Sequence, residues 1–333
     1  MYVPLRVTSA HSVGAGTIRA EDLASFCAGN GIPAAGIADR DSLAGTMATA
    51  KVLRAKGVQP LTGTTLRLRS GACEGDVVLY ATGPAGWAGL LRVANAWNIP
   101  EPALRRAPGL DELGALLGDG ASEILVLTGG PDGLIEKLLV ANLAAARKAL
   151  ADLAALFPSR VYVEIQRGFE GADRNAVEIS QLADALALPL LGTCPATHRS
   201  AEMLEAHEAY LCITGKAYLA SDDRPRAVAG QPLLSPAAMA ELFADMPEAL
   251  ENSVEFARRA VFMPEPAPAR LPSFPCHEGE DEAACCAGWP SRGSCVASKP
   301  SGPGARRPIP RPTAPGSPTG STPSCGWALP ATS

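Results

Sequence analysis

Residues 32–47, IPAAGIADRDSLAGTM, contain the local pattern on which the fold depends. The apolar run PAAGIAD at 33–39 is typical of a buried strand, and Ser42 follows it in a position to cap a helix. A strand followed directly by a helix is the building block of parallel sheets and barrels. The apolar face of the predicted helix consists of residues at helical spacing: Leu43, Met47, Ala50 and Leu53.

The same alternation runs outward from this stretch, from Tyr2 to about Val261. Thr17 is predicted to cap another helix, whose apolar face begins at Leu23. The pattern is strand then helix throughout, which predicts the α/β class with a parallel sheet or barrel. Further strands are predicted for VPLRV (3–7), QPLTGTTLRLR (59–69), DVVLYAT (76–82), EILVLTG (123–129), RVYVEIQ (160–166) and LPLLGTC (188–194).

The composition is that of a globular protein. With 333 residues and 47% hydrophobic content, the chain can bury one large α/β domain or two smaller ones. Its formal net charge of -5 gives no reason to expect strong nucleic-acid binding by this chain alone. The sequence has neither an apolar run long enough to span a membrane nor a secretion signal at its start. We therefore expect a cytoplasmic protein that makes no membrane contact.

Some features outside the strand pattern are interpreted as structural. Trp87 and Trp97 are predicted to anchor the core, with an interface as the alternative. His207 is predicted to be a packed helix residue, because apolar residues flank it at helical spacing. The cysteines in apolar segments are expected to be buried thiols in a reducing compartment: Cys27, Cys73, Cys194 and Cys212.

Six stretches matter for their order and spacing: LRVTSAHS (5–12), IPAAGIADRDSLAGTM (32–47), GVQPLTGTTL (57–66), VYVEIQR (161–167), AHEAYLCITGKAY (206–218) and LLSPAAMAELFADMPEALENSVEFARRA (233–260). Together they resemble the PHP domain at the start of bacterial DNA polymerase III alpha subunits. The resemblance extends from Tyr2 to about Glu282 and implies a distorted (β/α)7 barrel followed by a short helical segment. In metal-competent relatives, the strand ends carry His, Asp and Glu ligands for divalent ions, which would support phosphoester hydrolysis.

The resemblance places most of these ligand positions on residues that cannot bind a metal. A guanidinium group repels a cation, and a hydroxyl group does not replace an imidazole. His11 and His198 lie an odd number of residues from the expected positions, and an odd step along a strand points to the opposite face. The vestigial positions are Arg6, Thr8, Asp39, Arg40, Thr65, Glu164, Pro195 and Thr197.

Two carboxylates remain at the vestigial site. As remnants of a metal site, Asp39 and Glu164 could hold one weak ion, but the structural interpretation is preferred. We predict that Asp39 accepts hydrogen bonds from the loop leading to Ser42, and that Glu164 pairs with Arg6 or Arg40. We accordingly expect no catalytic residue, no cofactor and no bound metal.

The chain is predicted to consist of three parts. Residues 1–233 are expected to form the barrel domain, and residues 234–282 a helical segment leading toward a polymerase core that this chain lacks. Residues 283–333 are rich in Pro, Gly, Ser and Cys, and are expected to be disordered. One DNA sequence that could encode CCAGWP (285–290) encodes LLRRMA when it is read from one base earlier. We therefore interpret this tail as out of frame after a frameshift near Ala284.

The resemblance implies a part in DNA replication, where the parent activity is templated nucleotidyl transfer by a DNA-directed DNA polymerase. The fragment itself is expected to be a non-catalytic scaffold, because two-metal transfer requires palm-domain aspartates that lie beyond this region in relatives. Expected partners are the remainder of the alpha subunit and the proofreading exonuclease subunit. The alternative is a metal-dependent phosphoesterase or 3'-5' exonuclease of PHP type, which would require Zn, Mn or Mg.

Overall fold

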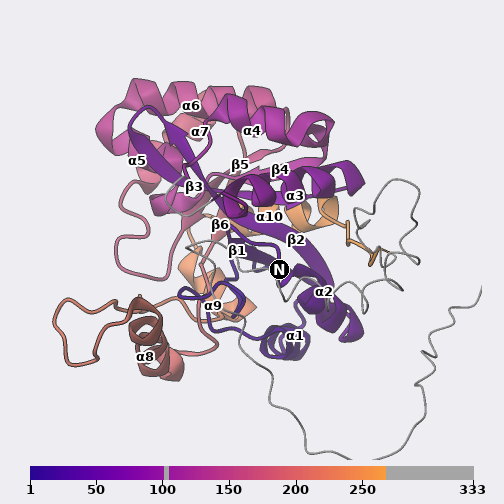
Figure 1. The fold of residues 1–333 in the computed structure, drawn as a ribbon. Helices are drawn as coiled ribbons and strands as arrows, with labels where there is room; N and C mark the ends of the chain where they lie inside the picture. Colours follow the sequence, from indigo (N-terminus) through magenta and orange to yellow (C-terminus); the bar gives the residue numbers. More distant parts are fainter. Residues whose placement is uncertain (101–104, 268–333) are drawn as a thin grey trace, which may run out of the picture. The chain divides into compact units, whose positions relative to one another are not determined.

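The computed structural model describes residues 1–100 and 105–267, and its centre is a curled sheet of six strands (Figure 1). Neighbours in the sheet follow the order of the chain, from β1 to β6. The sheet is built from apolar segments with few exposed positions. The strands are β1 (Ala34–Arg40), β2 (Gln59–Ser70), β3 (Cys73–Ala81), β4 (Ile124–Leu127), β5 (Val161–Gln166) and β6 (Leu190–Thr193).

The N-terminal segment closes this sheet into a barrel. Val7 forms a parallel bridge with Ile37 of β1 on one side and with Ala196, just after β6, on the other. The backbone amide of Thr8 donates to the carbonyl of Ala196 at 2.9 Å, and the amide of Ala196 donates to the carbonyl of Arg6 at 2.8 Å. The predicted α/β class and distorted barrel are thus confirmed. Residues 3–7, which were predicted as the first strand, take the seventh place in the ring between β1 and β6. They pair with these neighbours at only a few residues.

The sheet is not parallel throughout, which differs from the strand-then-helix pattern predicted from the sequence. Strands β2 and β3 form an antiparallel hairpin in which Ser70 pairs with Cys73, and β3 is also antiparallel to β4. Strands β2 and β3 must be antiparallel because only two residues connect them, whereas a parallel crossover needs a dozen or more. Gly71 supplies the positive φ, +60°, of the tight turn.

Helices cover the outside of the barrel, and two of them begin later than predicted (Figure 1). The hydroxyl group of Thr17 does not cap the helix but donates to the carbonyl of Thr197 at 3.2 Å. Ser42 accepts a hydrogen bond from the amide of Ala44 instead of capping its helix. The helices are α1 (Ala20–Gly29), α2 (Thr46–Ala55), α3 (Pro84–Asn98), α4 (Leu110–Leu117), α5 (Leu134–Ala141), α6 (Leu143–Leu156), α7 (Ala176–Ala185), α8 (Leu204–Gly215), α9 (Pro236–Leu242) and α10 (Pro247–Arg259).

Helix α10 packs against the inside of the barrel and forms part of the core. Phe256 is fully buried, and its ring centroid lies 5.3 Å from that of Tyr80 and 5.1 Å from that of Tyr162. The amide of Val3 donates to the hydroxyl of Ser253 at 3.1 Å, which joins the first residues of the chain to this helix. The helices of the predicted 234–282 segment therefore belong to the same compact unit as the barrel, Met1–Ala267.

The residues interpreted as structural are placed as follows. Trp87 packs against the main core, whereas Trp97 is half-buried and lines a surface cavity. Cys27, Cys194 and Cys212 are buried free thiols, and Cys73 is half-buried. In the described part of the chain, no helix combines the length and apolarity that crossing a bilayer requires. The predictions made for residues 283–333 lie outside the described residues.

Candidate functional site

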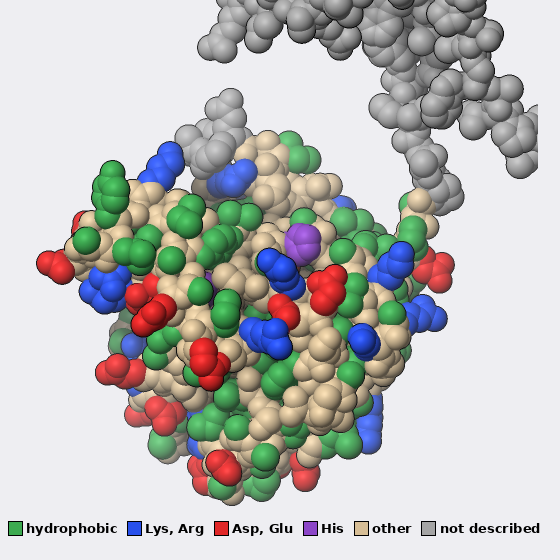
Figure 2. Space-filling view, turned by 90° about the horizontal axis from the view of Figure 1, so that it is seen from below, with side chains coloured by type: hydrophobic (Ala, Val, Ile, Leu, Met, Phe, Trp, Pro, Cys, Tyr) green, Lys and Arg blue, Asp and Glu red, His purple; other side chains and the backbone are tan. Residues whose placement is uncertain are grey.

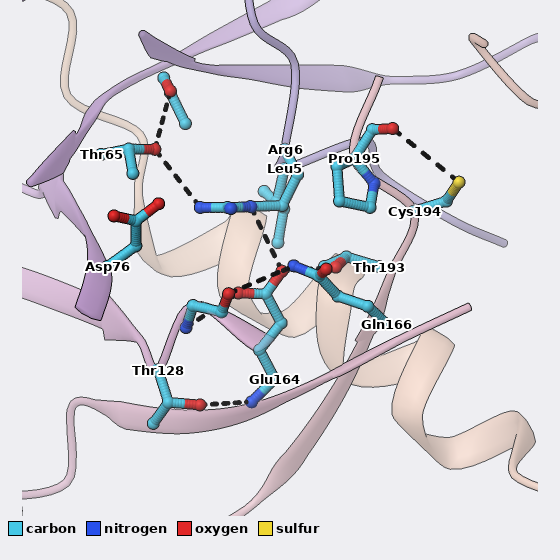
Figure 3. Close-up of polar contacts among 12 residues, drawn as sticks. Leu5, Arg6, Thr65, Asp76, Thr128, Glu164, Gln166, Thr193, Cys194 and Pro195 are labelled. Carbon is cyan, nitrogen blue, oxygen red and sulfur yellow. Dashed lines mark hydrogen bonds and ion pairs between the residues drawn. The ribbon is translucent and has the colours of Figure 1, made fainter. Parts of the chain in front are cut away.

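The carboxyl ends of β1, β5 and β6 meet the N-terminal segment at one end of the barrel, the barrel mouth. This arrangement brings the predicted site residues together, because they lie within, at the end of, or just after strands of the same ring. Arg6 projects into the centre of the group drawn in Figure 3, with Thr65 on one side and Glu164 on another. The question is whether this group could hold a metal ion.

Arg6 and Glu164 form a buried ion pair in the barrel mouth (Figure 3). The Nε atom of Arg6 lies 3.3 Å from Oε1 of Glu164, and their side chains are 9% and 0% exposed. The Nη1 atom of Arg6 donates to the hydroxyl of Thr65 at 3.3 Å. Glu164 is thus paired with one of its two predicted partners. Three further groups donate to its carboxylate: the Gln166 amide, the Thr193 hydroxyl and the Gly129 backbone N–H.

Asp39 is also buried and hydrogen-bonded, but not to the loop predicted from the sequence. Its Oδ1 accepts from the amide of Ser9 at 2.7 Å and from the hydroxyl of Ser12 at 2.9 Å. Its Oδ2 accepts from the hydroxyl of Ser9 at 2.7 Å. The prediction that Asp39 would bind the loop leading to Ser42 is therefore wrong. The N-terminal segment lies beside β1 in the barrel, so the loop that follows it folds onto Asp39.

Arg40 pairs with a carboxylate that the sequence analysis did not single out. Its guanidinium group donates to both carboxylate oxygens of Asp76, at 2.9 and 2.7 Å, and Arg67 lies 3.8 Å from the same carboxylate. Burial by itself would lower the pKa of Arg40, but the hydrogen bonds to Asp76 outweigh it and hold this pKa above its usual value. Asp76 faces Arg67 across the β2–β3 hairpin. An antiparallel reading of residues 59–82 would have found this pairing.

The residues present do not fit the divalent-metal cluster that the resemblance implies. The Arg6 guanidinium points at Glu164, and every oxygen of Glu164 and Asp39 already accepts a hydrogen bond. Within residues 1–100 and 105–267, no group of three or more His, Cys, Asp or Glu side chains is placed to hold a metal ion. Three vestigial positions supply only weak donors or none: Thr8 and Thr197 are half-buried hydroxyls, and Pro195 is buried.

His11 and His198 do not restore the missing ligands. His198 is buried, its Nδ1 lies 3.1 Å from the Thr197 hydroxyl, and its ring centroid lies 5.5 Å from that of His207, with the ring planes tilted by 39°. His11 is exposed and lies against Gly45, close to Asp39, where a Cβ atom built on the glycine would come within 2.5 Å of the imidazole. An imidazole and one carboxylate that already accepts three hydrogen bonds do not make a divalent-metal site.

Glu136, near the start of α5, is a buried acid that the sequence analysis missed. Its side chain accepts a hydrogen bond from the Asn175 amide at 3.1 Å, and the residue is 4% exposed. Burial raises its pKa from 4.5 to about 7, and the negative charge of Glu164 adds to this effect while the Asn175 hydrogen bond opposes it. A buried acid within an apolar helix turn carries no distinctive sequence signal, because LIEKLL also fits an ordinary amphipathic helix.

Glu136 is expected to make the protein less stable as the pH rises. The folded protein holds this proton up to a pH of about 7, whereas an unfolded chain releases it near 4.5, so the stabilisation is complete below 4.5 and lost as the pH rises through 7. Urea unfolding across this window should show a decline of a few kcal/mol at most. The variant Glu136→Gln should remove that decline. An unchanged pH dependence in the variant would contradict the assignment.

Comparison with known proteins identifies the family. The model of the PHP domain matches residues 4–168. The chain is 32% identical over 300 residues to the DNA polymerase III subunit alpha of Caulobacter vibrioides, covering 85% of this chain and 25% of that protein. It is also 32% identical to the subunit alpha of Neisseria meningitidis and 30% identical to an error-prone DNA polymerase of Symbiobacterium thermophilum. The chain thus spans about a quarter of the length of these relatives.

Among solved structures, a two-domain protein of Bacteroides vulgatus, described as containing a predicted PHP-like metal-dependent phosphoesterase, is 9% identical, with a TM-score of 0.36. The match covers 78% of this chain and 69% of that one. The family model and the polymerase relatives cover the same barrel that carries the buried Arg6–Glu164 pair. This chain therefore belongs to the PHP domain family, and over most of its length it is similar to DNA polymerase III subunits alpha.

Proposed function

We propose that this chain is a degenerate PHP domain that acts as a non-catalytic scaffold in a replicative DNA polymerase. The observation that carries the proposal is the Arg6 guanidinium in the barrel mouth, 3.3 Å from the fully buried Glu164. In this position, Arg6 supplies the positive charge that a divalent ion would otherwise bring to Glu164. A guanidinium group cannot activate water or polarise a phosphoryl oxygen as a metal ion does.

The second ion pair supports the same proposal. Asp76 is buried and engaged by both guanidinium nitrogens of Arg40, so it is not free to coordinate a cation. Bidentate contacts of this kind fix the relative positions of the elements that carry them. Arg40 ends β1, and Asp76 lies in β3, so the pair braces the two strands that flank β2. The polar groups of the mouth hold the barrel together, as a scaffold requires.

The activity of the whole polymerase is assigned to parts that lie outside this chain. Nucleotidyl transfer in DNA replication needs paired carboxylates that hold two metal ions, and the proposal places these in the palm domain that follows in an alpha subunit. The partners of this domain would be the remainder of the alpha subunit and, as a second contact, the proofreading exonuclease subunit. The formal charge of -5 supports neither strong nucleic-acid binding nor anchoring to an anionic membrane, and on the face drawn in Figure 2 the basic and acidic side chains are mixed. The proposed location is the cytoplasm.

An activity assay separates this proposal from the alternative of a metal-dependent phosphoesterase or 3'-5' exonuclease. The complete chain is incubated with single-stranded DNA and with a simple phosphodiester, in the presence of Zn, Mn or Mg. No hydrolysis above the protein-free reaction is expected. Metal-dependent hydrolysis that chelation abolishes would contradict the proposal if the variants Asp39→Asn and Glu164→Gln remove it. Equal hydrolysis by both variants would identify a contaminating nuclease.

A further inference from the structure

Helix α8 lies apart from the other helices and has little buried surface of its own (Figure 1). Only His207 and Cys212 are buried among its residues. Ile213 is 76% exposed, and Tyr218, just beyond the helix, is 82% exposed. A helix with so few buried side chains depends on a small number of contacts for its position. Two hydrogen bonds join α8 to the loop after the N-terminal segment: the Tyr210 hydroxyl accepts one from the Gly14 amide at 3.0 Å, and His207 makes the other, which is the more buried of the two.

His207 fastens α8 to the loop that follows the N-terminal segment. Its Nε2 lies 2.9 Å from the carbonyl oxygen of Ala15, an atom that can only accept a hydrogen bond. The proton of the neutral imidazole is therefore on Nε2, and Nδ1 carries the lone pair. Nδ1 is buried and has no hydrogen-bond partner within the described residues. Protonation of Nδ1 would thus create a buried N–H group without an acceptor.

A second buried histidine faces the first. The ring centroids of His198 and His207 lie 5.5 Å apart, and the two residues are 1% and 3% exposed. The backbone of His198 is fixed by the amide of Leu233, which donates to its carbonyl at 3.2 Å. Two positive charges at this separation and burial would repel each other strongly. The two imidazoles therefore cannot both be protonated in the folded arrangement, and His207, whose Nδ1 has no acceptor within the described residues, is the one held neutral.

We propose that His198 and His207 form a proton-sensitive latch, which holds α8 on the barrel when both rings are neutral and releases it when they are protonated. The latch borders the barrel mouth: His198 contacts the Thr197 hydroxyl, and the loop that reaches Ala15 also carries Ser12, which donates to Asp39. It acts on one helix, because the two rings join α8 to the N-terminal loop and to the strand end after β6.

The neighbouring charged groups do not replace the two imidazoles as the proton sensor. Burial lowers the pKa of both histidines, and for His198 the charge of His207 lowers it further. The folded protein favours the neutral rings, whereas an unfolded chain takes up protons near the ordinary histidine pKa of 6.5. The two histidines therefore stabilise the folded arrangement above pH 6.5, and this contribution is lost as the pH falls below 6.5. The nearby charged side chains are paired elsewhere or exposed: Glu208 with Arg224, Arg199 with Asp22, and Glu202 and Glu205 in solvent.

Hydrogen exchange of the complete chain at about pH 7.5 and about pH 5.5 tests the latch. Rates are divided by those of an unstructured peptide at each pH. The amides of α8 should lose about 5- to 150-fold in protection at the lower pH, as expected for one buried donor left without an acceptor. The amides of α3 should keep theirs. Unchanged protection of α8, or equal losses in α8 and α3, would overturn the proposal.

Matched variants identify the sensor. His207→Gln keeps an N–H donor for the Ala15 carbonyl but cannot be protonated, so its α8 should keep its protection at both pH values. His11→Gln removes an exposed imidazole and should behave like the unmodified protein. A full pH response in both His207→Gln and His198→Gln would overturn the proposal. If α8 is unprotected at both pH values in His207→Gln, an NMR titration of the unmodified protein decides. His207 must titrate below the ordinary histidine pKa of about 6.5, and titration at or above that value refutes the latch.

Discussion

Replacing Arg6 by methionine is expected to lower the free energy of unfolding by about 3–5 kcal/mol. The substitution keeps most of the apolar stem but removes the cation beside Glu164, which is fully buried. A buried charge without its partner is costly, and the hydrogen bonds from Gln166, Thr193 and Gly129 offset only part of that cost. Urea unfolding monitored by circular dichroism at neutral pH measures the difference.

The double variant Arg6→Met/Glu164→Gln provides the control for this prediction. Removing both charges should recover most of the lost stability, because no uncompensated ion remains in the barrel mouth. Arg67→Met is the matched single control, since this guanidinium lies 3.8 Å from Asp76 and its side chain is 45% exposed. A loss below about 1 kcal/mol is expected there. If Arg6→Met also cost no more than that, the ion pair would not organise the mouth.

Replacing Phe256 by alanine should cost about 3–5 kcal/mol of unfolding free energy. Its ring is fully buried and makes edge-to-face contacts with Tyr80 and Tyr162 inside the barrel. Truncation would leave a cavity between α10 and the strands that the rigid ring of strands cannot close. Thermal and urea unfolding of the complete chain would both report the loss.

The neighbouring residue Glu255 supplies the control for the Phe256 variant. Its side chain is 54% exposed and pairs only with Arg258 on the same helix. Glu255→Ala should therefore change stability by less than about 0.5 kcal/mol. A similarly small effect of Phe256→Ala would mean that α10 does not belong to the barrel core, in contrast to its placement against Tyr80 and Tyr162.

The barrel could be predicted from the sequence because most of its units are local. A buried strand such as 33–39 and the apolar helix face after it both leave a periodic signal. The hairpin of β2 and β3 was missed because residues 59–69 and 76–82 each look like any buried strand. Only the shortness of the segment between them shows that they must be antiparallel. The packing of α10 against Tyr80 and Tyr162 is a long-range contact that no local pattern encodes.

The sequence identifies most residues of the barrel mouth, but it predicts their ion-pair and hydrogen-bond partners only in part. The sequence predicts Arg6 or Arg40 as the partner of Glu164, because cations and a carboxylate occupy positions that the family places together, and the structure shows Arg6 in that role. Asp39 was assigned to the wrong loop, since its partners Ser9 and Ser12 are neighbours only in the closed barrel. Asp76 was missed altogether. The partner of a buried charge is set by tertiary packing, and a single sequence does not show which of several carboxylates a given arginine reaches.

Elemental analysis of the purified chain shows whether Arg6 stands in the barrel mouth where metal ions would otherwise bind. The complete chain would be produced in cells supplied with Zn and Mn, purified without chelators and measured for metal content. A substoichiometric content that does not rise when Zn or Mn is added back is the predicted result. Tight, stoichiometric binding of several ions that is lost in Asp39→Asn and Glu164→Gln would contradict it.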